Sequence, residues 1–292
     1  MTQKTLRKSR IMLIASMAIF GTLGIFVKNI PVSSGELALY RAVMATLMLG
    51  TYFLITGRKI NFREIRKELP LLLISGMAMG INWILLFEAY RYTTVSVATL
   101  SYYFAPVIVT VACPILFKEN MGAKQWICFG MSTLGIVLIT GIGDFGGRDT
   151  HFIGILLGLG AAVLYASVIL LNKFIKGVAG IQRTFLQFLA AIVILLPYVL
   201  CSGGLSLGGM DGIGWLNLLI VGIVHTGVTY CLYFSSLKEI PGQEAAILSY
   251  IDPLVAVAVS VFLLGEPMTL PQLIGGALIL GFTLFNEIKP NG

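Results

Sequence analysis

The sequence predicts an all-α integral membrane protein with ten transmembrane helices, arranged as two inverted five-helix repeats with both termini in the cytoplasm. Three observations lead to this fold class. Hydrophobic residues make up 57% of the 292 residues and charged residues only 11%, whereas a soluble domain has about 25% charged residues with which to cover its surface. Long apolar segments recur along the whole chain, and the second half repeats residues of the first half.

The apolar segments have the length of membrane spans, because a helix needs about 20 mostly apolar residues to cross a hydrocarbon core of about 30 Å. In the first half we expect spans at residues 11–28, 35–57, 69–90, 95–116 and 123–141. In the second half we expect spans at residues 152–172, 183–201, 214–237, 244–264 and 270–287. Each segment is continuously apolar, which favours helices over the alternating strands of a membrane barrel.

Turn-forming residues mark several boundaries between these segments. Pro31 and Ser33 precede the second segment, as expected at a capped helix start. Gly203 and Gly204 follow the segment 183–201 and predict a break in the helix there.

The basic residues predict the orientation of the helices. With the N-terminus inside, only Lys28, Arg91 and Arg148 lie outside and only Arg41 lies within a span, which leaves sixteen of the twenty Lys and Arg residues on the inner side. Such an excess is typical of cytoplasmic loops. We therefore expect a multi-pass protein of the cell inner (cytoplasmic) membrane with N- and C-termini in the cytoplasm. The net charge of +7 follows from this topology, so no nucleic-acid partner is expected.

The two halves of the chain, 11–141 and 152–287, are expected to form one five-helix repeat each. At an offset of 147 residues, identical residues pair along the fourth and fifth segments of each half: Ala98 with Ala245, Tyr103 with Tyr250, Pro106 with Pro253, Leu116 with Leu263, Glu119 with Glu266, Met121 with Met268 and Gln125 with Gln272. An odd number of helices per repeat inserts the two copies in opposite orientations. Inverted repeats of this kind are typical of alternating-access transporters, which hold a small-molecule substrate near the midplane between the halves.

The motifs at the fourth segment of each repeat resemble those of a known family. They read Ser101-Tyr102-Tyr103-Phe104-Ala105-Pro106 with Lys118-Glu119-Asn120-Met121, and Tyr250-Ile251-Asp252-Pro253 with Gly265-Glu266-Pro267-Met268-Thr269. With the ten-helix pattern, they resemble the EamA-type members of the drug/metabolite transporter superfamily over residues 11–287. The first copy differs in having Lys118 where the second has Gly265. The resemblance implies the fold and a transporter, and this family includes exporters of amino acids, other metabolites and drugs.

Four titratable residues within the spans are candidates for a functional site, because a charge inside a bilayer persists when it is paired, hydrated or used. Asp252 precedes Pro253 at mid-depth and is interpreted as a substrate-amine contact or coupling site, or else as a structural ion pair or helix cap. Arg41 either pairs with Asp252 or Glu88 or binds a substrate carboxylate through its planar fork. Glu88 either reaches water at the outer end of its helix or takes part in coupling. His225 is either a helix–helix hydrogen bonder or a proton relay that also lines the substrate cavity.

Aromatic residues at mid-depth predict the wall of a substrate cavity, with lipid or core packing as the alternative for each. Trp83 and Phe87 lie four residues apart and share a helix face. With the charged candidates, the expected substrate-binding residues are Trp83, Tyr103, Tyr165, His225, Tyr230, Tyr250, Asp252 and Arg41. Gating or structural roles are expected for Pro106, Pro253, Glu119 and Glu266, and coupling roles are considered for Asp252, His225 and Glu88. Close helix crossings are expected at Gly76/Gly80 and Gly154/Gly158.

The function expected from the sequence is secondary active export of amino acids or related small metabolites by alternating access. An aromatic cavity with few charges favours an apolar or aromatic zwitterion. Three alternatives remain: a multidrug or nucleoside-type exporter of the same fold, an intramembrane lipid-modifying enzyme built on Asp252, Arg41 and His225, and a non-conducting sensor or scaffold. HExxH and P-loop signatures are absent, so no enzyme, metal, cofactor or ATP-driven step is expected, and the partners are a small-molecule substrate and the lipid bilayer.

Overall fold

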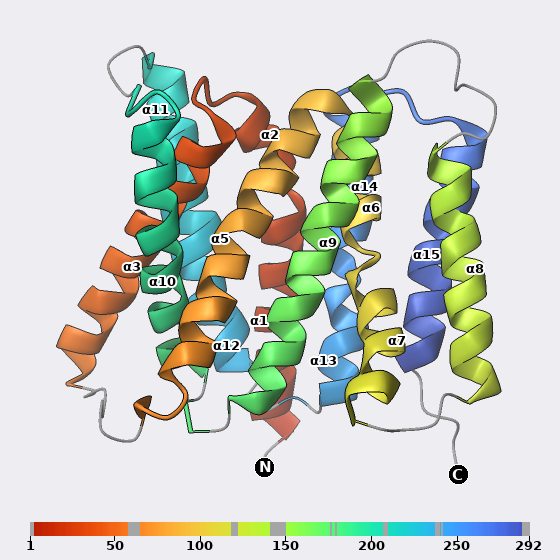
Figure 1. The fold of residues 1–292 in the computed structure, drawn as a ribbon, viewed down its shortest axis with the longest axis horizontal. Helices are drawn as coiled ribbons and strands as arrows, with labels where there is room; N and C mark the ends of the chain where they lie inside the picture. The colour runs from red at the N-terminus through yellow and green to blue at the C-terminus, as the bar shows by residue number, and fades with distance from the viewer. Residues whose placement is uncertain are drawn as a thin grey trace.

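The structure is a computed structural model, and it describes residues 3–57, 65–117, 122–140, 150–175, 177–178, 180–206, 210–236, 240 and 242–287. All regular secondary structure in these residues is helical, and the helices stand side by side as a bundle (Figure 1). Seven helical stretches are long and apolar enough to cross a membrane, and three shorter apolar helices lie at Ala123–Ile139, Ile247–Phe262 and Leu270–Asn286. These stretches coincide with the apolar segments expected from the sequence, so the helical membrane class is confirmed.

The helices of the first half follow the expected segments, with extra breaks. They are α1 (Gln3–Gly21), α2 (Leu23–Lys28), α3 (Ser34–Thr56), α5 (Leu69–Tyr92), α6 (Val95–Tyr102), α7 (Ala105–Phe117) and α8 (Ala123–Thr140). The first helix begins at Gln3, eight residues before the apolar segment at 11–28, so the basic residues that precede this segment are helical as well. It is interrupted at Thr22, whose Oγ1 donates a hydrogen bond to the carbonyl of Ile19 (2.8 Å), a local bond that competes with the helical ladder.

The helices of the second half include one π-helical stretch. They are α9 (Thr150–Phe174), α10 (Gly180–Cys201), α11 (Gly212–Leu219), the π-helical η2 (Ile220–Val228), α12 (Thr229–Ser236), α13 (Gly242–Ser249), α14 (Ile251–Phe262) and α15 (Leu270–Glu287). α11, η2 and α12 follow one another without a gap and together form the expected segment 214–237. Figure 1 shows that α1 begins and α15 ends at the same end of the bundle.

The fourth and ninth segments are both interrupted at mid-length. α6 ends at Tyr102 and α7 begins at Ala105, while α13 ends at Ser249 and α14 begins at Ile251. Pro106 and Pro253 lie in the first turn after each break, where a missing backbone donor is tolerated. The breaks therefore fall around Tyr103 and Tyr250, the two tyrosines that the sequence pairs at an offset of 147 residues.

Capping and turn residues explain the boundaries that the sequence predicts. Ser33 and Glu36 form a reciprocal capping box at the start of α3, which satisfies two backbone donors that the helix leaves unpaired. Gly203 and Gly204 have φ values of 125° and 80°, a left-handed conformation that side chains disfavour. The chain accordingly leaves α10 at these glycines, as expected.

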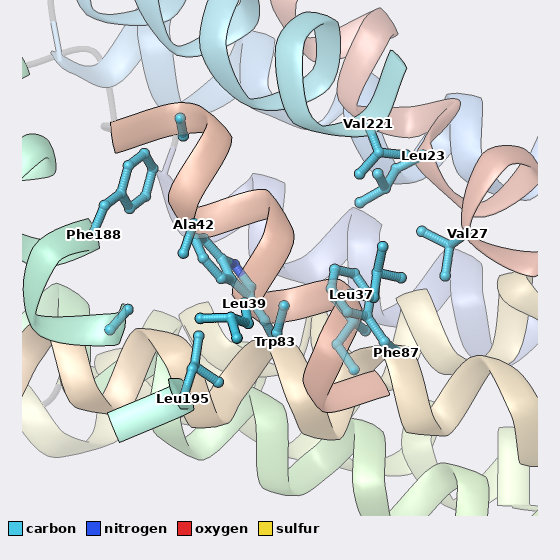
Figure 2. Close-up of a cluster of buried hydrophobic side chains, with 14 of the residues drawn as sticks. Leu23, Val27, Leu37, Leu39, Ala42, Trp83, Phe87, Phe188, Leu195 and Val221 are labelled. Atoms are coloured by element: carbon cyan, nitrogen blue, oxygen red, sulfur yellow. The ribbon is translucent and has the colours of Figure 1, made fainter. Parts of the chain in front are cut away.

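The largest apolar core lies where α3, α5 and α10 meet. Figure 2 shows Trp83 and Phe87 of α5 beside Leu37 and Leu39 of α3, with Phe188 of α10 nearby. Phe87 and Phe188 are fully buried. Trp83 and Phe87 therefore share a buried helix face, as their spacing predicts.

Glycines allow several helices to cross closely. Gly76 and Gly80 of α5 lie against α10, where a Cβ on Gly76 would meet the Cβ of Ala190 at 2.6 Å. Gly158 of α9 lies against α6, where a Cβ would come within 3.1 Å of the Ala98 carbonyl oxygen. The expected close crossings at Gly76/Gly80 and Gly154/Gly158 are confirmed, and the packing positions α5, α6 and α9 around the central cavity.

The helices α8 and α15 pack against each other at one edge of the bundle (Figure 1). Their contact is reciprocal at two glycines: a Cβ on Gly135 would meet the Gly275 carbonyl oxygen at 2.6 Å, and a Cβ on Gly275 would meet the Gly135 carbonyl oxygen at 2.5 Å. Real Cβ atoms do not approach other atoms this closely. The two backbones thus meet directly, without side chains between them.

Candidate functional site

A central cavity of about 450 Å³ lies among the interrupted helices, within the range of typical ligand pockets. Its wall combines two opposite charges with many aromatic rings. The residues expected from the sequence that line it are Arg41, Trp83, Tyr103, Pro106, Tyr165, Tyr230, Tyr250 and Asp252. These residues come from both halves of the chain, so the cavity lies between the halves.

Arg41 is held in the cavity wall on two sides. It projects from α3, is only 4% exposed, and its Nε donates a hydrogen bond to Thr226 Oγ1 (2.7 Å). Its guanidinium carbon lies 4.8 Å from the centre of the Trp83 ring and 5.7 Å from that of Phe87, the geometry of a cation–π contact. Trp83 and Phe87, which were predicted to share a helix face, therefore both contact the guanidinium.

Asp252 faces the same cavity from the first turn of α14. Its Oδ2 accepts a hydrogen bond from the hydroxyl of Tyr103 (2.5 Å), which joins the break in the fourth segment to the break in the ninth. Asp252 and Arg41 influence each other electrostatically, but among the described residues neither takes part in a salt bridge. Neither of the ion pairs weighed for Arg41, with Asp252 or with Glu88, is formed.

Aromatic rings make up much of the rest of the cavity wall. Tyr102 stacks on Tyr165 with ring centres 5.1 Å apart, and Tyr230 meets Phe20 edge to face at 5.2 Å. Tyr165 remains 38% exposed although it belongs to a long apolar helix, because its ring faces the cavity. The wall therefore offers apolar ring faces together with tyrosine hydroxyls.

His225 lies outside the lining of the cavity. It is buried in η2, shares a hydrogen bond with Thr22 Oγ1 (2.9 Å) at the break between α1 and α2, and lies against the ring of Phe26 at 4.9 Å. This is the helix–helix hydrogen bond that the sequence leaves as an alternative to a proton relay. The next residue, Thr226, is the one that contacts Arg41.

Glu266 lies beyond the cavity, at the end of the bundle opposite the start of α1. It pairs with Lys28 at the end of α2, accepts a hydrogen bond from Ser260 Oγ of α14, and accepts another from the backbone N–H of Val95 at the start of α6 (2.7 Å). α2, α6 and α14 all contribute residues to the cavity wall. One carboxylate thus ties three cavity helices together. Glu119, its expected counterpart, lies outside the described residues.

Glu88 and Pro253 also lie outside the cavity lining. Glu88 accepts hydrogen bonds from Ser34 Oγ (2.5 Å) and Arg91 (3.5 Å) and is partly exposed, so it reaches the surface, as one of its two expected roles requires. Pro253 is buried in the first turn of α14. Its structural effect is the interrupted segment.

A second cavity of about 630 Å³ lies at the same end of the bundle as Lys28 and Arg91. Its wall carries Ser33, Ser34, Glu36 and Ser206 among other residues. Tyr90 lines this outer cavity and the central cavity alike. The two cavities therefore adjoin the same residue at Tyr90.

Several lining residues were not expected from the sequence. Tyr90, Tyr102 and Tyr233 line the central cavity; Tyr102 stands in the motif Ser101–Pro106, whereas Tyr90 and Tyr233 lie toward the ends of their expected segments, where the sequence gives no signal for a cavity. Asn82 also lines it, and its side-chain amide donates to the Ala161 carbonyl (2.5 Å). Thr226 has no signal in the sequence, because its role depends on a hydrogen bond to a residue 185 positions away.

Comparison with known proteins agrees with these features. A sequence model of the EamA-like transporter family matches the chain twice, at residues 7–141 and 152–286. Uncharacterized transporter YxxF of Bacillus subtilis (strain 168) is 29% identical over 283 residues, covering 97% of this chain and 90% of that protein. An uncharacterized transporter of Archaeoglobus fulgidus is 28% identical over 283 residues, covering 96% of this chain and 97% of that protein.

Two further similarities concern a named activity and the fold. A Salmonella typhimurium protein named "Probable amino-acid metabolite efflux pump" is 26% identical over 255 residues, covering 82% of this chain and 84% of that protein. A solved structure described as "Crystal structure of protein" has the same fold, with a TM-score of 0.65 at 16% identity, covering 94% of this chain and 95% of the other. The family match spans nearly the whole chain and confirms the resemblance noted in its motifs. This protein is a membrane transporter that belongs to the EamA-like transporter family.

Proposed function

We propose that this chain is a secondary active transporter that exports amino acids or related zwitterionic metabolites across the cytoplasmic membrane. One observation carries the proposal: Arg41 and Asp252 line the same aromatic cavity without forming a salt bridge there. A buried charge without a partner is costly in a bilayer. A zwitterion satisfies both at once, its carboxylate on the Arg41 fork and its ammonium group on Asp252.

The atoms left over by the internal hydrogen bonds support this orientation. Arg41 uses Nε for Thr226, so its two Nη groups are the donors that remain for a ligand. Asp252 uses Oδ2 for Tyr103, so Oδ1 remains as an acceptor. A ligand that bridges these atoms places its side chain among the rings of Trp83 and the cavity tyrosines.

Alternating access is the part of the proposal that explains the arrangement of the helices. Both interrupted segments border the cavity, and interruptions of this kind are typical hinges and binding elements in transporters built from repeats. The contacts of Glu266 hold α2, α6 and α14 together at one end. Opening the cavity toward that end requires those contacts to break, so we assign Glu266 to the outer closure.

The orientation in the membrane belongs to the proposal as well. The distribution of Lys and Arg predicts that the start of α1 and the end of α15 lie in the cytoplasm, and their position at one end of the bundle supports this prediction (Figure 1). Of the three residues expected to take part in coupling, Asp252 is the one that lines the cavity. We therefore assign proton coupling, if transport responds to a pH gradient, to Asp252 rather than to His225 or Glu88.

Counterflow into proteoliposomes tests the substrate class. The panel contains an aromatic amino acid, its methyl ester, its N-acetyl derivative, a nucleoside and a lipophilic cationic drug, each with and without a pH gradient. We expect the free amino acid to exchange best, because the ester lacks the carboxylate for Arg41 and the N-acetyl derivative lacks the ammonium group for Asp252. A preference for the nucleoside or the drug would instead support a multidrug or nucleoside-type exporter of the same fold.

Two charge-removing variants sharpen this test. Asp252→Asn is expected to lower exchange of the amino acid and its ester but not of the N-acetyl derivative, and Arg41→Gln is expected to lower exchange of the amino acid and the N-acetyl derivative but not of the ester. Asp211→Asn is the matched control, because Asp211 caps α11 away from the cavity and Asn caps a helix as well as Asp does. Equal losses for all three compounds would refute the assigned contacts.

The lipid-modifying enzyme weighed from the sequence needs Asp252, Arg41 and His225 at one polar site. His225 is buried against Phe26 and Thr22 and does not line the cavity that holds the other two. The relatives named above are transporters. Both observations favour transport over catalysis.

A further inference from the structure

The position of Arg41 in the cavity depends on a second residue, Thr226. Arginine side chains are long and lose much rotational freedom when they are fixed in one place. The face of the Arg41 guanidinium rests on Trp83 and Phe87, but a ring face does not fix the rotation of the fork within its plane. The hydrogen bond from Nε to Thr226 Oγ1 (2.7 Å) fixes that rotation.

The hydroxyl of Thr226 is itself oriented by the π-helix. Thr226 is fully buried, and its Oγ1 donates a hydrogen bond to the carbonyl of Val221 (2.9 Å), five residues earlier. In a π-helix the carbonyl that faces residue i belongs to residue i−5, and Thr226 lies within η2. Because the hydroxyl proton is committed to Val221, the lone pairs of Oγ1 are left to accept from Arg41.

We propose that Thr226 is a positioning residue that turns the two Nη groups of Arg41 toward the carboxylate of the transported zwitterion. This inference rests on the proposed function and deepens it. The rings of Trp83 and Phe87 fix the plane of the guanidinium, and Thr226 fixes its rotation within that plane. The Nη donors that bind a carboxylate are therefore oriented before the substrate enters. Pre-organised donors of this kind reduce the ordering cost of binding.

The same helix supplies a matched control. Thr229 begins α12, is fully buried, and its Oγ1 donates to the carbonyl of Val224 (2.7 Å), which is also five residues earlier. Among the described residues, Thr226 and not Thr229 accepts the hydrogen bond from Arg41, and Thr229 does not line the cavity. Thr226→Val and Thr229→Val therefore remove equivalent hydroxyls from the same helix, and only the first removes a partner of Arg41.

The test compares a substrate that has a carboxylate with one that lacks it. Counterflow KM values are measured for the amino acid and for its methyl ester in the wild type, Thr226→Val, Thr226→Ser and Thr229→Val. We expect Thr226→Val to raise the KM for the amino acid about tenfold, as for a lost hydrogen bond to a charged group, and to leave the KM for the ester unchanged. Thr226→Ser restores the acceptor and the wild-type KM, and Thr229→Val leaves both values unchanged.

The outcomes distinguish the positioning role of Thr226 from the proposed substrate class. Equal changes for the amino acid and the ester, or none for either, would overturn the positioning role while the proposed substrate class stands. If the wild type does not discriminate between the two compounds, the substrate class fails and the positioning role fails with it. If Thr226→Val does not fold, Thr226→Ala removes the same hydroxyl without a second methyl group, and the expectations are unchanged.

A double-mutant cycle distinguishes a positioning role of Thr226 from a purely structural one. Because Thr226 acts through Arg41, Thr226→Val is expected to have no further effect on the KM for the amino acid in an Arg41→Gln background. Additive losses in the double variant would mean that Thr226 acts by another route, and the inference would be wrong.

Discussion

The contact between α8 and α15 makes the most direct prediction about stability. A Cβ on Gly135 would lie 2.6 Å from the Gly275 carbonyl oxygen and 2.8 Å from Ile279 Cγ1, and both distances are too short without a shift of the backbone. Gly135→Ala therefore forces the two helices apart. Overpacking of this kind costs about 1–3 kcal/mol, and the alanine returns about 0.5–1 kcal/mol as the better helix former.

Controls on the same two helices remove the helix-propensity contribution. A Cβ on Gly130 of α8 or on Gly281 of α15 would meet no atom within 4 Å. Gly130→Ala and Gly281→Ala are therefore expected to be neutral or stabilising. The difference between Gly135→Ala and Gly130→Ala then measures the steric effect alone, and we expect it to be about 1–3 kcal/mol.

The assay is unfolding in mixed detergent micelles titrated with a denaturing detergent. We expect Gly275→Ala to match Gly135→Ala, because each glycine faces the carbonyl of the other. The double variant is expected to lose less than the two single losses together, because one separation of the helices relieves both clashes. Equal unfolding free energies for Gly135→Ala and Gly130→Ala would refute the close contact of the two backbones.

Two further substitutions test the cavity and its outer closure. Trp83→Leu removes a ring that contacts the Arg41 guanidinium, so we expect the counterflow affinity for amino acids to fall about 2- to 30-fold. The control Trp126→Leu, on the exposed face of α8, is expected to have no effect. Equal effects of the two variants would contradict the contact between Trp83 and Arg41. Glu266→Gln weakens the contacts that hold three cavity helices together. In a cysteine-free protein with Thr99→Cys, we therefore expect the new cysteine to react faster with a membrane-impermeant thiol reagent added outside. An unchanged reaction rate would count against the role of Glu266 in closing the outer end of the cavity.

The apolar segments were predictable because hydropathy over about twenty residues is a local property of the chain. The breaks around Tyr103 and Tyr250 had a local signal too, since Pro106 and Pro253 follow them. The mid-depth aromatic residues and the two deep charges pointed to the cavity for a similar reason. Arg41 and Asp252 stand out in any lipid-embedded segment, and the structure places both in one wall.

The details around Arg41 were not predictable, because they depend on distant parts of the chain. The break at Thr22 is linked to His225, 203 residues away, and Arg41 is linked to Thr226, 185 residues away. The π-helical stretch adds to the difficulty, because it changes which residues face a given side. The sequence singled out His225 as a cavity residue, whereas its neighbour Thr226 makes the contact to the cavity arginine.

The position of Tyr90 between the two cavities has a consequence for the order of events in transport. Its hydroxyl contacts Thr99 Oγ1 at 3.4 Å, and the side chain is buried. A molecule that moves directly from the central cavity to the outer cavity along Tyr90 has to disturb this contact. The Tyr90 contact and the Glu266 contacts involve different side chains, so passage past Tyr90 and the parting of the Glu266 contacts are separate events that do not have to occur together.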